Sequence, residues 1–515
     1  MRRLLSLSIL ALAAAAAQAC GGDASESRTL NYYFTYDPRS LDPAVATDVP
    51  TGEMVAMLFD NLTLIDAEGV VHPGLARSWE TDSTGRVYTF HLRGGVTFHD
   101  GRPLTARDVV ASLRRSLEGT NQGLNVLAGV RGARDFAARR AQEVSGLAAP
   151  DDTTLVVTLD QPLNIFPKLM AMPVAAVVPA SPPADFDQRP VGSGPWKFVS
   201  WAHDDQLVLA KNERHWGMVP KSDSLRVRIV PEPLTQAAEY EAGRLSVVEV
   251  PFGETRRWED QHGEEIQRRP AMRVLYIAMN TNRGPLKDAR VRRALNHAVD
   301  AGTILKNVMA GRGVRSAGSI PPGVEGYDST RAPYAYDPAK AKQLLAEAGH
   351  PNGFALQLWR SQRPEYGRIA QAVQQQLAQV GVRVEIVERD ASSARAASAK
   401  GEADLFLTDW YGDYPDPEAF HFPTFHSSNK GTGGNRAFFG DPRVDGFIER
   451  ARATPDSALK LSLSREVDAM VFEQAPWIFL WFPVDMWAVR PEVEGYRVPA
   501  IFYGQRWTDA RVTAE

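Results

Sequence analysis

The sequence predicts an α/β protein with more than one lobe, and three features support this class. The chain has 515 residues, well beyond the size of one hydrophobic core, so we expect two or three lobes. Hydrophobic residues make up 44% of the chain and charged residues 23%, as in folded globular proteins. Residues 354–388 have the pattern of a strand-helix-strand unit, which joins parallel strands of one sheet.

The first half of the chain contains mainly strand patterns. Residues 87–104 ("VYTFHLRGGVTFHDGRPL") predict a hairpin or meander that turns at Asp100-Gly101. Thr105 is the expected N-cap of a helix over 106–119. Alternating apolar residues between turn residues predict further strands over 29–36, 153–162, 206–212 and 224–233.

The second half is predicted to contain helices and a second sheet. An amphipathic helix pair is expected over 288–311, and a helix that begins at the N-cap Asp337 is expected over 337–349. After the crossover of 354–388, residues 403–410 ("ADLFLTDW") predict another strand. The C-terminal half should therefore hold a mostly parallel sheet.

The N-terminus has the pattern of a signal peptide over residues 1–19. Two arginines precede an apolar run that is shorter than the about 20 residues of a membrane helix and ends in small residues. Cys20, the sole cysteine, follows this run, and we expect its thiol to carry a lipoprotein diacylglycerol with 20–28 as a flexible tether. The alternative is cleavage after Ala19 by ordinary signal peptidase. Either reading predicts an exported protein.

Several chemistries lack their motifs in this sequence. A net charge of −4 offers no basic face for nucleic acid. The chain has no G-x-S-x-G elbow, no P-loop and no H-E-x-x-H zinc motif. Ser193, in "GSGP", is expected in a tight turn, and His421 and His426 lack a metal-binding spacing. We therefore expect no nucleic acid, bound metal or cofactor.

The stretch "DWYGDYPDPEAF" (409–420) combines acids with large rings at the end of the last predicted strand. Ligands of open α/β sheets bind beyond the carboxyl ends of strands, so a site is expected here. Asp413 and Asp416 could form the acid pair of a glycoside hydrolase. One carboxylate could instead bind an organic ammonium group beside Trp410 and Tyr411. In a third interpretation the rings fill the core and the acids cap turns.

Eight short segments place these patterns in a known context, because they follow the order found in one family. Together they resemble the extracellular solute-binding proteins of the dipeptide/oligopeptide/nickel class (family 5), which serve ABC importers. The resemblance covers nearly the whole length after residue 28. The segments are "SLDP" (40–43), "PGLARSWE" (73–80), "YTFHLRGGVTFHDGRPLTARDV" (88–109), "PVGSGPWKFVSW" (190–201), "KNERHW" (211–216), "DARVRRALNHAVD" (288–300), "YDPAKAKQLLAEAG" (336–349) and "DWYGDYPDPEAF" (409–420).

The resemblance implies a bilobal α/β fold of the periplasmic-binding-protein-like type (type II, cluster C), with mixed sheets and an extra inserted subdomain. Lobe I would be discontinuous, over 29–60, 186–272 and 488–515. The subdomain would occupy 61–185 and lobe II 273–487. The two lobes would close over a ligand about a hinge.

The resemblance also implies roles for particular residues. In peptide-binding members, the acid at the position of Asp413 holds the ligand's α-ammonium group, whereas Asp416 and Glu418 would only shape the loop. The ligand's carboxylate would be read by Arg363 or Arg360, of which Arg363 matches the dipeptide-binding position better. The residues expected to flank an extended ligand are Trp410, Tyr411, Thr47 and Val49.

The implied function is that of a receptor rather than an enzyme. It would be a monomer in the periplasm or cell envelope, anchored to the membrane by lipid at Cys20. It would deliver short peptides to an ABC permease that is powered by separate ATPase subunits. The alternatives are the same fold carrying a nickel chelate, a sugar or another cationic solute, and a carboxylate-based hydrolase.

Overall fold

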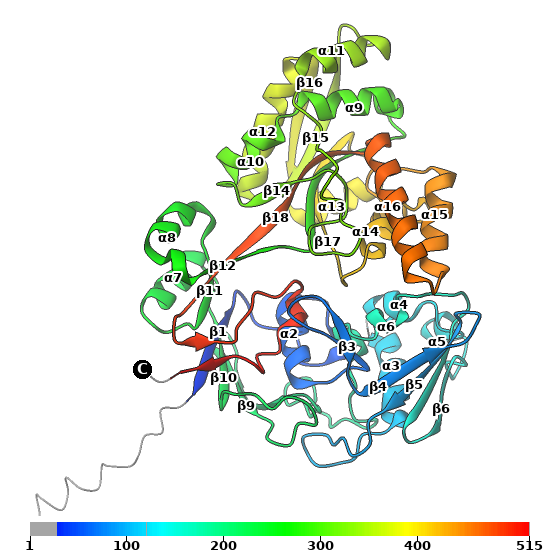
Figure 1. Cartoon of the computed structure of the whole chain (residues 1–515), viewed down its shortest axis with the longest axis vertical. Coiled ribbons are helices and arrows are strands. Elements are labelled where there is room, and N and C mark those ends of the chain that lie inside the picture. Colours follow the sequence, from blue (N-terminus) through cyan, green and yellow to red (C-terminus); the bar gives the residue numbers. More distant parts are fainter. Residues whose placement is uncertain (1–27, 120, 514–515) are drawn as a thin grey trace, which may run out of the picture.

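The computed structural model describes residues 28–119 and 121–513, and the predicted signal peptide, Cys20 and the tether up to residue 27 lie outside them. The described chain forms two four-stranded sheets, one eight-stranded sheet and two two-stranded ribbons (Figure 1). Short 3-10 helices lie at Pro43–Val45, Pro173–Ala175, Phe252–Glu254, Gly263–Glu265, Gly284–Lys287, Ser427–Asn429, Gly431–Gly433 and Phe502–Gly504.

One four-stranded sheet forms the centre of lobe I. Its strands are β1 (Thr29–Phe34), β8 (Trp196–Ala202), β9 (Gln206–Lys211) and β10 (Ser224–Ile229). Their order is β1-β10-β9-β8, with β1 parallel to β10 and the other neighbours antiparallel. Side chains of α2 (Val49–Leu58), α7 (Pro233–Glu241) and α8 (Thr255–His262) join this sheet in one hydrophobic core. The C-terminal ribbon of β19 (Val493–Glu494) and β20 (Arg511–Val512) belongs to the same lobe.

The subdomain has its own sheet and its own core. The sheet order is β4-β5-β7-β6. Its strands are β4 (Ala76–Thr81), β5 (Val87–Leu92), β6 (Leu147–Asp151) and β7 (Thr154–Thr158). The remaining elements are the ribbon of β2 (Thr63–Ile65) and β3 (Val71–Pro73) and the helices α3 (Ala106–Gly119), α4 (Asn121–Leu127), α5 (Ala133–Ala137) and α6 (Phe166–Leu169). Helix α3 begins after Thr105 as predicted, and the Asp108 carboxylate accepts the Thr105 N–H at 2.9 Å.

The predicted hairpin or meander over 87–104 is confirmed around Asp100-Gly101, where Thr97 and Pro103 form an antiparallel bridge, and it is wrong for the pairing of β5. Strand β5 pairs with β4 and β7, which come from other parts of the chain. Val96 and Phe98 instead belong to a small loop in which the Phe98 N–H donates to the Arg102 carbonyl at 2.9 Å. Val96 and Phe98 alternate with other residues because both side chains are buried in the subdomain core, and this alternation resembles that of a strand. The turn is confirmed, because Gly101 adopts a φ of +89°, a conformation that glycine allows.

The eight-stranded sheet forms the centre of lobe II, and one end of it extends into the hydrophobic core of lobe I. Its order is β11-β18-β13-β17-β15-β16, and β12 and β14 also pair with β18. The strands are β11 (Val247–Glu249), β12 (Ile266–Pro270), β13 (Arg273–Met279), β14 (Gly313–Arg315), β15 (Phe354–Ser361), β16 (Val382–Arg389), β17 (Leu405–Tyr411) and β18 (Trp477–Val489). The prediction of a mostly parallel sheet is wrong, because only two strand pairs of this sheet are parallel, β15 with β16 and β15 with β17, and the others are antiparallel. The crossover pattern indicates local pairing alone, whereas β13 and β18 join from distant segments.

Helices cover both faces of this sheet, and each face has its own core. On one face the core includes side chains of α9 (Ala289–Ala298), α10 (Ala301–Val308), α11 (Pro338–Glu347) and α12 (Pro364–Ala378). On the other it includes side chains of α13 (Ala391–Ala399), α14 (Glu418–Phe425), α15 (Pro442–Ala453) and α16 (Ser457–Gln474). The predicted helices over 288–311 and 337–349 are confirmed, and the Asp337 side chain caps the Lys340 N–H at 2.9 Å.

The long strand β18 passes from lobe II toward lobe I. Its first residues pair with β13 and β14, and its last residues pair with β11 and β12 (Figure 1). The chain crosses a second time between Pro270 and Arg273, next to β18. Away from β18, the segment just before α6 contacts the C-terminal end of α15. There the Asn164 amide donates to the Ala451 and Thr454 carbonyls at 2.7 and 2.6 Å.

The "GSGP" turn has a structural role in lobe I. The Ser193 hydroxyl donates to the fully buried Asp60 carboxylate at 3.0 Å. A Cβ at Gly192 would lie 1.9 Å from the Leu58 carbonyl oxygen, so only glycine allows this close approach. Asp60 also pairs with Arg506 at 2.7 Å. In spite of burial, the Arg506 guanidinium and the His215 side chain hold the pKa of the Asp60 carboxyl well below the usual range.

Candidate ligand-binding site

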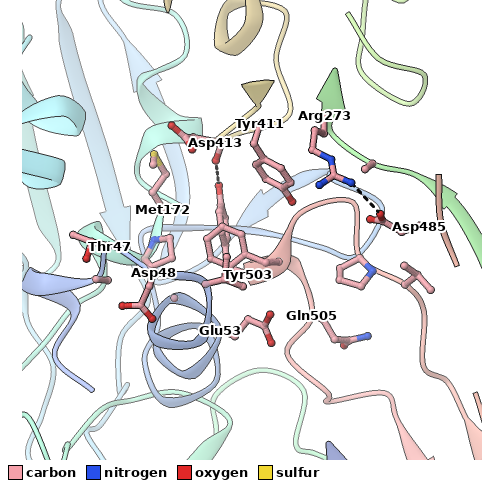
Figure 2. A pocket seen from close by; sticks show the side chains of 18 of the residues that line it. Thr47, Asp48, Glu53, Met172, Arg273, Tyr411, Asp413, Asp485, Tyr503 and Gln505 are labelled. Atoms are coloured by element: carbon pink, nitrogen blue, oxygen red, sulfur yellow. Dashed lines mark hydrogen bonds and ion pairs between the residues drawn. The ribbon is translucent and has the colours of Figure 1, made fainter. Parts of the chain in front are cut away.

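A cavity of about 860 Å³ lies between lobe I, the subdomain and lobe II. Figure 2 shows side chains from several elements that converge on it. Lobe I and the C-terminal segment contribute Tyr32, Tyr36, Thr47, Asp48, Val49, Glu53, Tyr496, Phe502, Tyr503, Gln505 and Trp507. The subdomain contributes Gln122, Met172, Pro173 and Val174. Lobe II and the hinge contribute Glu249, Arg273, Arg363, Arg395, Tyr411, Asp413, Asp485 and Trp487.

Asp413 faces this cavity two residues after the end of β17. Gly412 places it there: the Gly412 N–H continues the sheet by donating to the Met272 carbonyl at 2.8 Å. The Tyr503 hydroxyl from lobe I donates to the Asp413 carbonyl at 2.5 Å, as Figure 2 shows. The carboxylate is accessible from the cavity but enclosed by protein, and burial raises its pKa to about 6. It forms no ion pair or hydrogen bond with any side chain in the described part of the chain.

Asp416 and Glu418 lie outside the cavity and hold the loop in place. The fully buried Asp416 carboxylate pairs with Lys168 of the subdomain at 2.6 Å and with Lys460 of α16. Glu418 pairs with Arg452 at 2.7 Å. These lysines hold the pKa of the Asp416 carboxyl below its usual value in spite of burial. Asp413 and Asp416 therefore do not share a pocket, and the acid pair that a glycoside hydrolase needs is not assembled.

Trp410 and Tyr411 point to opposite faces of β17, because successive strand residues alternate. The exposed Tyr411 ring lines the cavity beside Phe502, with ring centres 6.5 Å apart. The Trp410 indole packs into the core of lobe II and donates to the Ala419 carbonyl at 2.8 Å. The Trp410 ring therefore does not line the cavity, contrary to the expectation that it contacts a ligand cation. The Trp410 backbone lies in the part of β17 after Phe406, which is the last residue of β17 that pairs with β15.

Thr47 and Val49 lie at the start of α2, and both are exposed to the cavity. Asp48 between them is the N-cap of the helix, and its carboxylate accepts the Thr51 N–H and hydroxyl, each at 3.0 Å. Pro50 follows at the beginning of the helix, where a missing N–H costs nothing. This cap therefore holds the predicted flanking segment at the wall of the cavity.

The structure separates the two arginines proposed from the sequence. Arg363, the residue before α12, lines the cavity and pairs with Asp409 at 3.3 Å. Arg360 is not part of the cavity wall, because its guanidinium pairs with Glu388 of the neighbouring strand β16. Arg395 of α13 lines the cavity as well, and it forms no ion pair with the described residues. The sequence pattern did not indicate Arg395.

Sequence reasoning also missed a charged group at the hinge. Arg273, at the start of β13, lies 4.0 Å from Asp485 of β18 and 3.8 Å from Asp409. Arg312 lies 3.7 Å from Glu249 of β11. Burial raises the pKa values of the Glu249 and Asp485 carboxyls. These residues are far apart in the sequence, and only strand pairing with β18 brings them together.

Glu53 is a further residue that sequence reasoning missed, although a local signal exists. It is the only charged residue of the helix "VPTGEMVAML", most of whose residues are buried. Burial raises the pKa of the Glu53 carboxyl to about 8, in spite of a hydrogen bond with Tyr32. An acid in a helix that otherwise packs into the core is a signal for a special role.

Metal clusters and membrane-spanning helices are both absent from the described part of the chain. Within residues 28–119 and 121–513 no group of three or more His, Cys, Asp or Glu side chains is arranged to hold a metal ion. In the same part of the chain, no helix has the length and apolar character needed to cross a membrane.

Two lobes joined by a hinge, with polar groups from both facing one cavity, define a bilobal ligand-binding protein. The family model "Bacterial extracellular solute-binding proteins, family 5 Middle" matches residues 70–432, and the chain belongs to this family. It is 32% identical over 448 residues to heme-binding protein A of Haemophilus influenzae, covering 83% of this chain and 81% of that protein. It is 30% identical over 518 residues to the dipeptide-binding protein of Escherichia coli strain K12, covering 96% and 95%. The structure of HbpA2 from Haemophilus parasuis is similar, with a TM-score of 0.83, 26% identity and coverage of 94% and 100%.

Proposed function

We propose that this protein is the substrate-binding receptor of an ABC importer, and that it captures short peptides between its lobes. The observation that carries this proposal is the Asp413 carboxylate, which faces the cavity without a cationic partner among the described residues. Similarity to the dipeptide-binding protein over nearly the full length of both chains supports the same function. The receptor then delivers the peptide to a permease powered by separate ATPase subunits.

The α-ammonium group of a peptide is the ligand group that suits Asp413. A charge-assisted hydrogen bond to a desolvated carboxylate contributes roughly 1.5–3 kcal/mol. The Tyr411 and Phe502 rings beside it provide apolar walls and cation–π attraction. The part of β17 beyond Phe406 has no β15 partner, so its edge is available for main-chain pairing with an extended peptide. Such pairing reads the backbone and tolerates varied side chains.

The lobes close about the hinge formed by β18 and by the segment between Pro270 and Arg273. Lobe closure around a ligand is a general property of hinged binding proteins. The export signal, the lipid at Cys20, the monomeric state and the absence of catalysis belong to the same proposal. Lipidation keeps the receptor at the membrane, where a permease can accept its cargo.

The test of this function is native mass spectrometry of the purified protein, measured intact and after denaturation. We expect co-purified ligands that fragment as peptides of two to six residues. A nickel chelate, a sugar, a heme group or another non-peptide solute would contradict the peptide assignment and leave the solute-binding family unaffected. Loss of turnover on a glycoside, with binding retained, is the result that a hydrolase would give in an Asp413→Asn variant.

The proposed ammonium site predicts a pH dependence of binding. The ammonium group requires the ionised Asp413 carboxylate, whose pKa is about 6 without ligand. The ionised fraction then falls from about 90% at pH 7 to about 10% at pH 5, so affinity should fall about tenfold over this range. Calorimetric titration with a trialanine peptide measures this change. Asp413→Asn should abolish it, and a tenfold loss that persists in that variant would contradict the assignment.

We propose that Arg363 reads the ligand's carboxylate, and a matched pair of variants tests this. Arg363→Gln should weaken binding of a free-acid peptide about tenfold and leave binding of its C-terminal amide unchanged, because only the free acid has the charge to lose. Arg360→Gln is the control, since Arg360 lies in the same segment but outside the cavity. If Arg395→Gln shows the loss and Arg363→Gln does not, the carboxylate is read from α13 instead.

A further inference from the structure

Glu53 is a second acid of the cavity that no cation of the described chain neutralises. It lies on α2 of lobe I, and Figure 2 shows its carboxylate across the cavity from Asp413, below Tyr503 and near Gln505. No Lys, Arg or His among residues 28–119 and 121–513 forms an ion pair with it. The two acids are carried by different lobes, so a ligand between the lobes can meet both.

The other acids of the cavity wall already have protein partners. Asp48 accepts two hydrogen bonds as the N-cap of α2. Asp485 lies 4.0 Å from Arg273, and Glu249 lies 3.7 Å from Arg312. Glu53, whose partner is the Tyr32 hydroxyl, and Asp413 are therefore the two carboxylates of the cavity wall that neither a cation nor a helix cap of the described chain holds. A peptide's α-ammonium group accounts for only one of them.

Aromatic rings surround the Glu53 end of the cavity. Tyr32, Trp487, Tyr496 and Trp507 all line it. They pack on one another: the Tyr32 ring centre is 4.9 Å from that of Trp507, which is 4.9 Å from that of Tyr496. In the described chain, no Arg or Lys side chain occupies the face of any of these four rings. Trp487 is partly exposed, whereas Tyr32, Tyr496 and Trp507 are 8%, 5% and 1% exposed, so Trp487 is the ring most open to a ligand. A carboxylate beside an accessible aromatic ring is an environment that binds organic cations.

We propose that Glu53 and this aromatic cluster, in which Trp487 is the most exposed ring, bind a basic side chain of the ligand, so that the receptor selects short peptides that contain lysine or arginine. This inference rests on the peptide-binding function proposed above. The carboxylate pairs with the ammonium or guanidinium group, and the rings bury the aliphatic stem.

The protonation state of Glu53 predicts a second measurable effect, which is proton release when a basic side chain binds. Burial raises its pKa to about 8, so the free receptor holds it mostly neutral at pH 7. Pairing with a cation favours the ionised form, so binding a basic side chain releases up to one proton. The titratable groups that interact with Glu53 are hydroxyls whose pKa values are themselves raised, so none of them ionises near pH 7: Tyr32, Tyr33, Tyr36, Tyr411 and Tyr496.

The test compares lysine peptides with norleucine peptides, which keep the alkyl chain and lack the ammonium group. The purified chain is freed of co-purified ligand by unfolding and refolding. Alanine-based tripeptides with lysine or norleucine at each of the three positions are then titrated calorimetrically, in two buffers of different ionisation enthalpy. We expect at least one lysine peptide to bind tenfold more tightly than its norleucine counterpart and to release more protons.

Glu53→Gln should remove this preference and the extra proton release. Asp135→Asn, an exposed acid of the subdomain, is the control. Equal binding of lysine and norleucine peptides, or a preference that survives Glu53→Gln, overturns the inference and leaves the proposed function intact. If no tripeptide binds, the proposed function fails and the inference fails with it. The comparison in the unaltered protein decides the matter even where Glu53→Gln does not fold.

Discussion

Replacing Asp413 with asparagine is expected to weaken the binding of free-amine peptides by roughly 10- to 150-fold. The factor corresponds to the roughly 1.5–3 kcal/mol of a charge-assisted hydrogen bond in a desolvated site. Asparagine keeps the size of the side chain, and the Tyr503 hydrogen bond is made to the backbone carbonyl, so the loop should keep its conformation. The variant therefore isolates the charge from the shape of the site.

N-acetylated peptides provide the internal comparison for this variant. They lack the ammonium group, so they should bind the unaltered receptor weakly and lose nothing further in Asp413→Asn. Calorimetric titration of each free and acetylated pair gives the coupling between the residue and the ammonium group directly. Asp135→Asn should behave like the unaltered protein. Equal losses for free and acetylated peptides would mean that Asp413 acts on the cavity as a whole.

Replacing Asp416 with asparagine is expected to have the largest effect on stability, a loss of about 3 kcal/mol in the free energy of unfolding. The substitution leaves Lys168 and Lys460 without their counter-charge at a fully buried position. We take the lower end of the range for broken buried pairs, because the lysine side chains are 23% and 13% exposed and can turn toward water. Asparagine can still accept the Glu418 N–H, so the change reports on charge.

Denaturant unfolding followed at several pH values measures this effect. The pKa of Asp416 is lowered in the folded protein, so its contribution is present above the unfolded value of about 4 and is lost as the pH falls through the folded value. The difference between the two proteins should therefore be full at pH 7 and shrink below pH 4. Asp135→Asn should stay within about 0.5 kcal/mol of the unaltered protein. A similarly small effect of Asp416→Asn would contradict a stabilising role for these pairs.

The Asp416 pairs also bear on the relation between the lobes. Lys168 belongs to the subdomain and Lys460 to lobe II, so the Asp416 carboxylate lies where these two parts meet. Asn164 adds two hydrogen bonds to lobe II at the same contact. The sequence indicated Asp416 as a loop residue, which is confirmed, but the partners that give it this role lie 248 and 44 residues away.

Elements with strong local signals could be predicted closely. Thr105 and Asp337 precede helices as expected, and the crossover of β15, α12 and β16 is confirmed as a parallel pair. The predictions that failed concern which strands pair with each other. Strand β5 has the predicted alternation, but its neighbours β4 and β7 come from elsewhere, and β13 and β18 make the second sheet mixed. Alternation indicates which face is buried and carries no information about the pairing strand.

The sequence by itself determined the family, the solute-binding class and the position of Asp413 at the end of a strand. Ordered motifs and strand-end acids are local in the chain, and the physical roles of glycine, proline and capping residues act over a few positions. Only the tertiary structure decided that Arg363 faces the cavity and Arg360 does not, and that Glu53 shares it with Asp413. Side-chain direction and burial depend on packing between segments hundreds of residues apart, which local pattern does not encode.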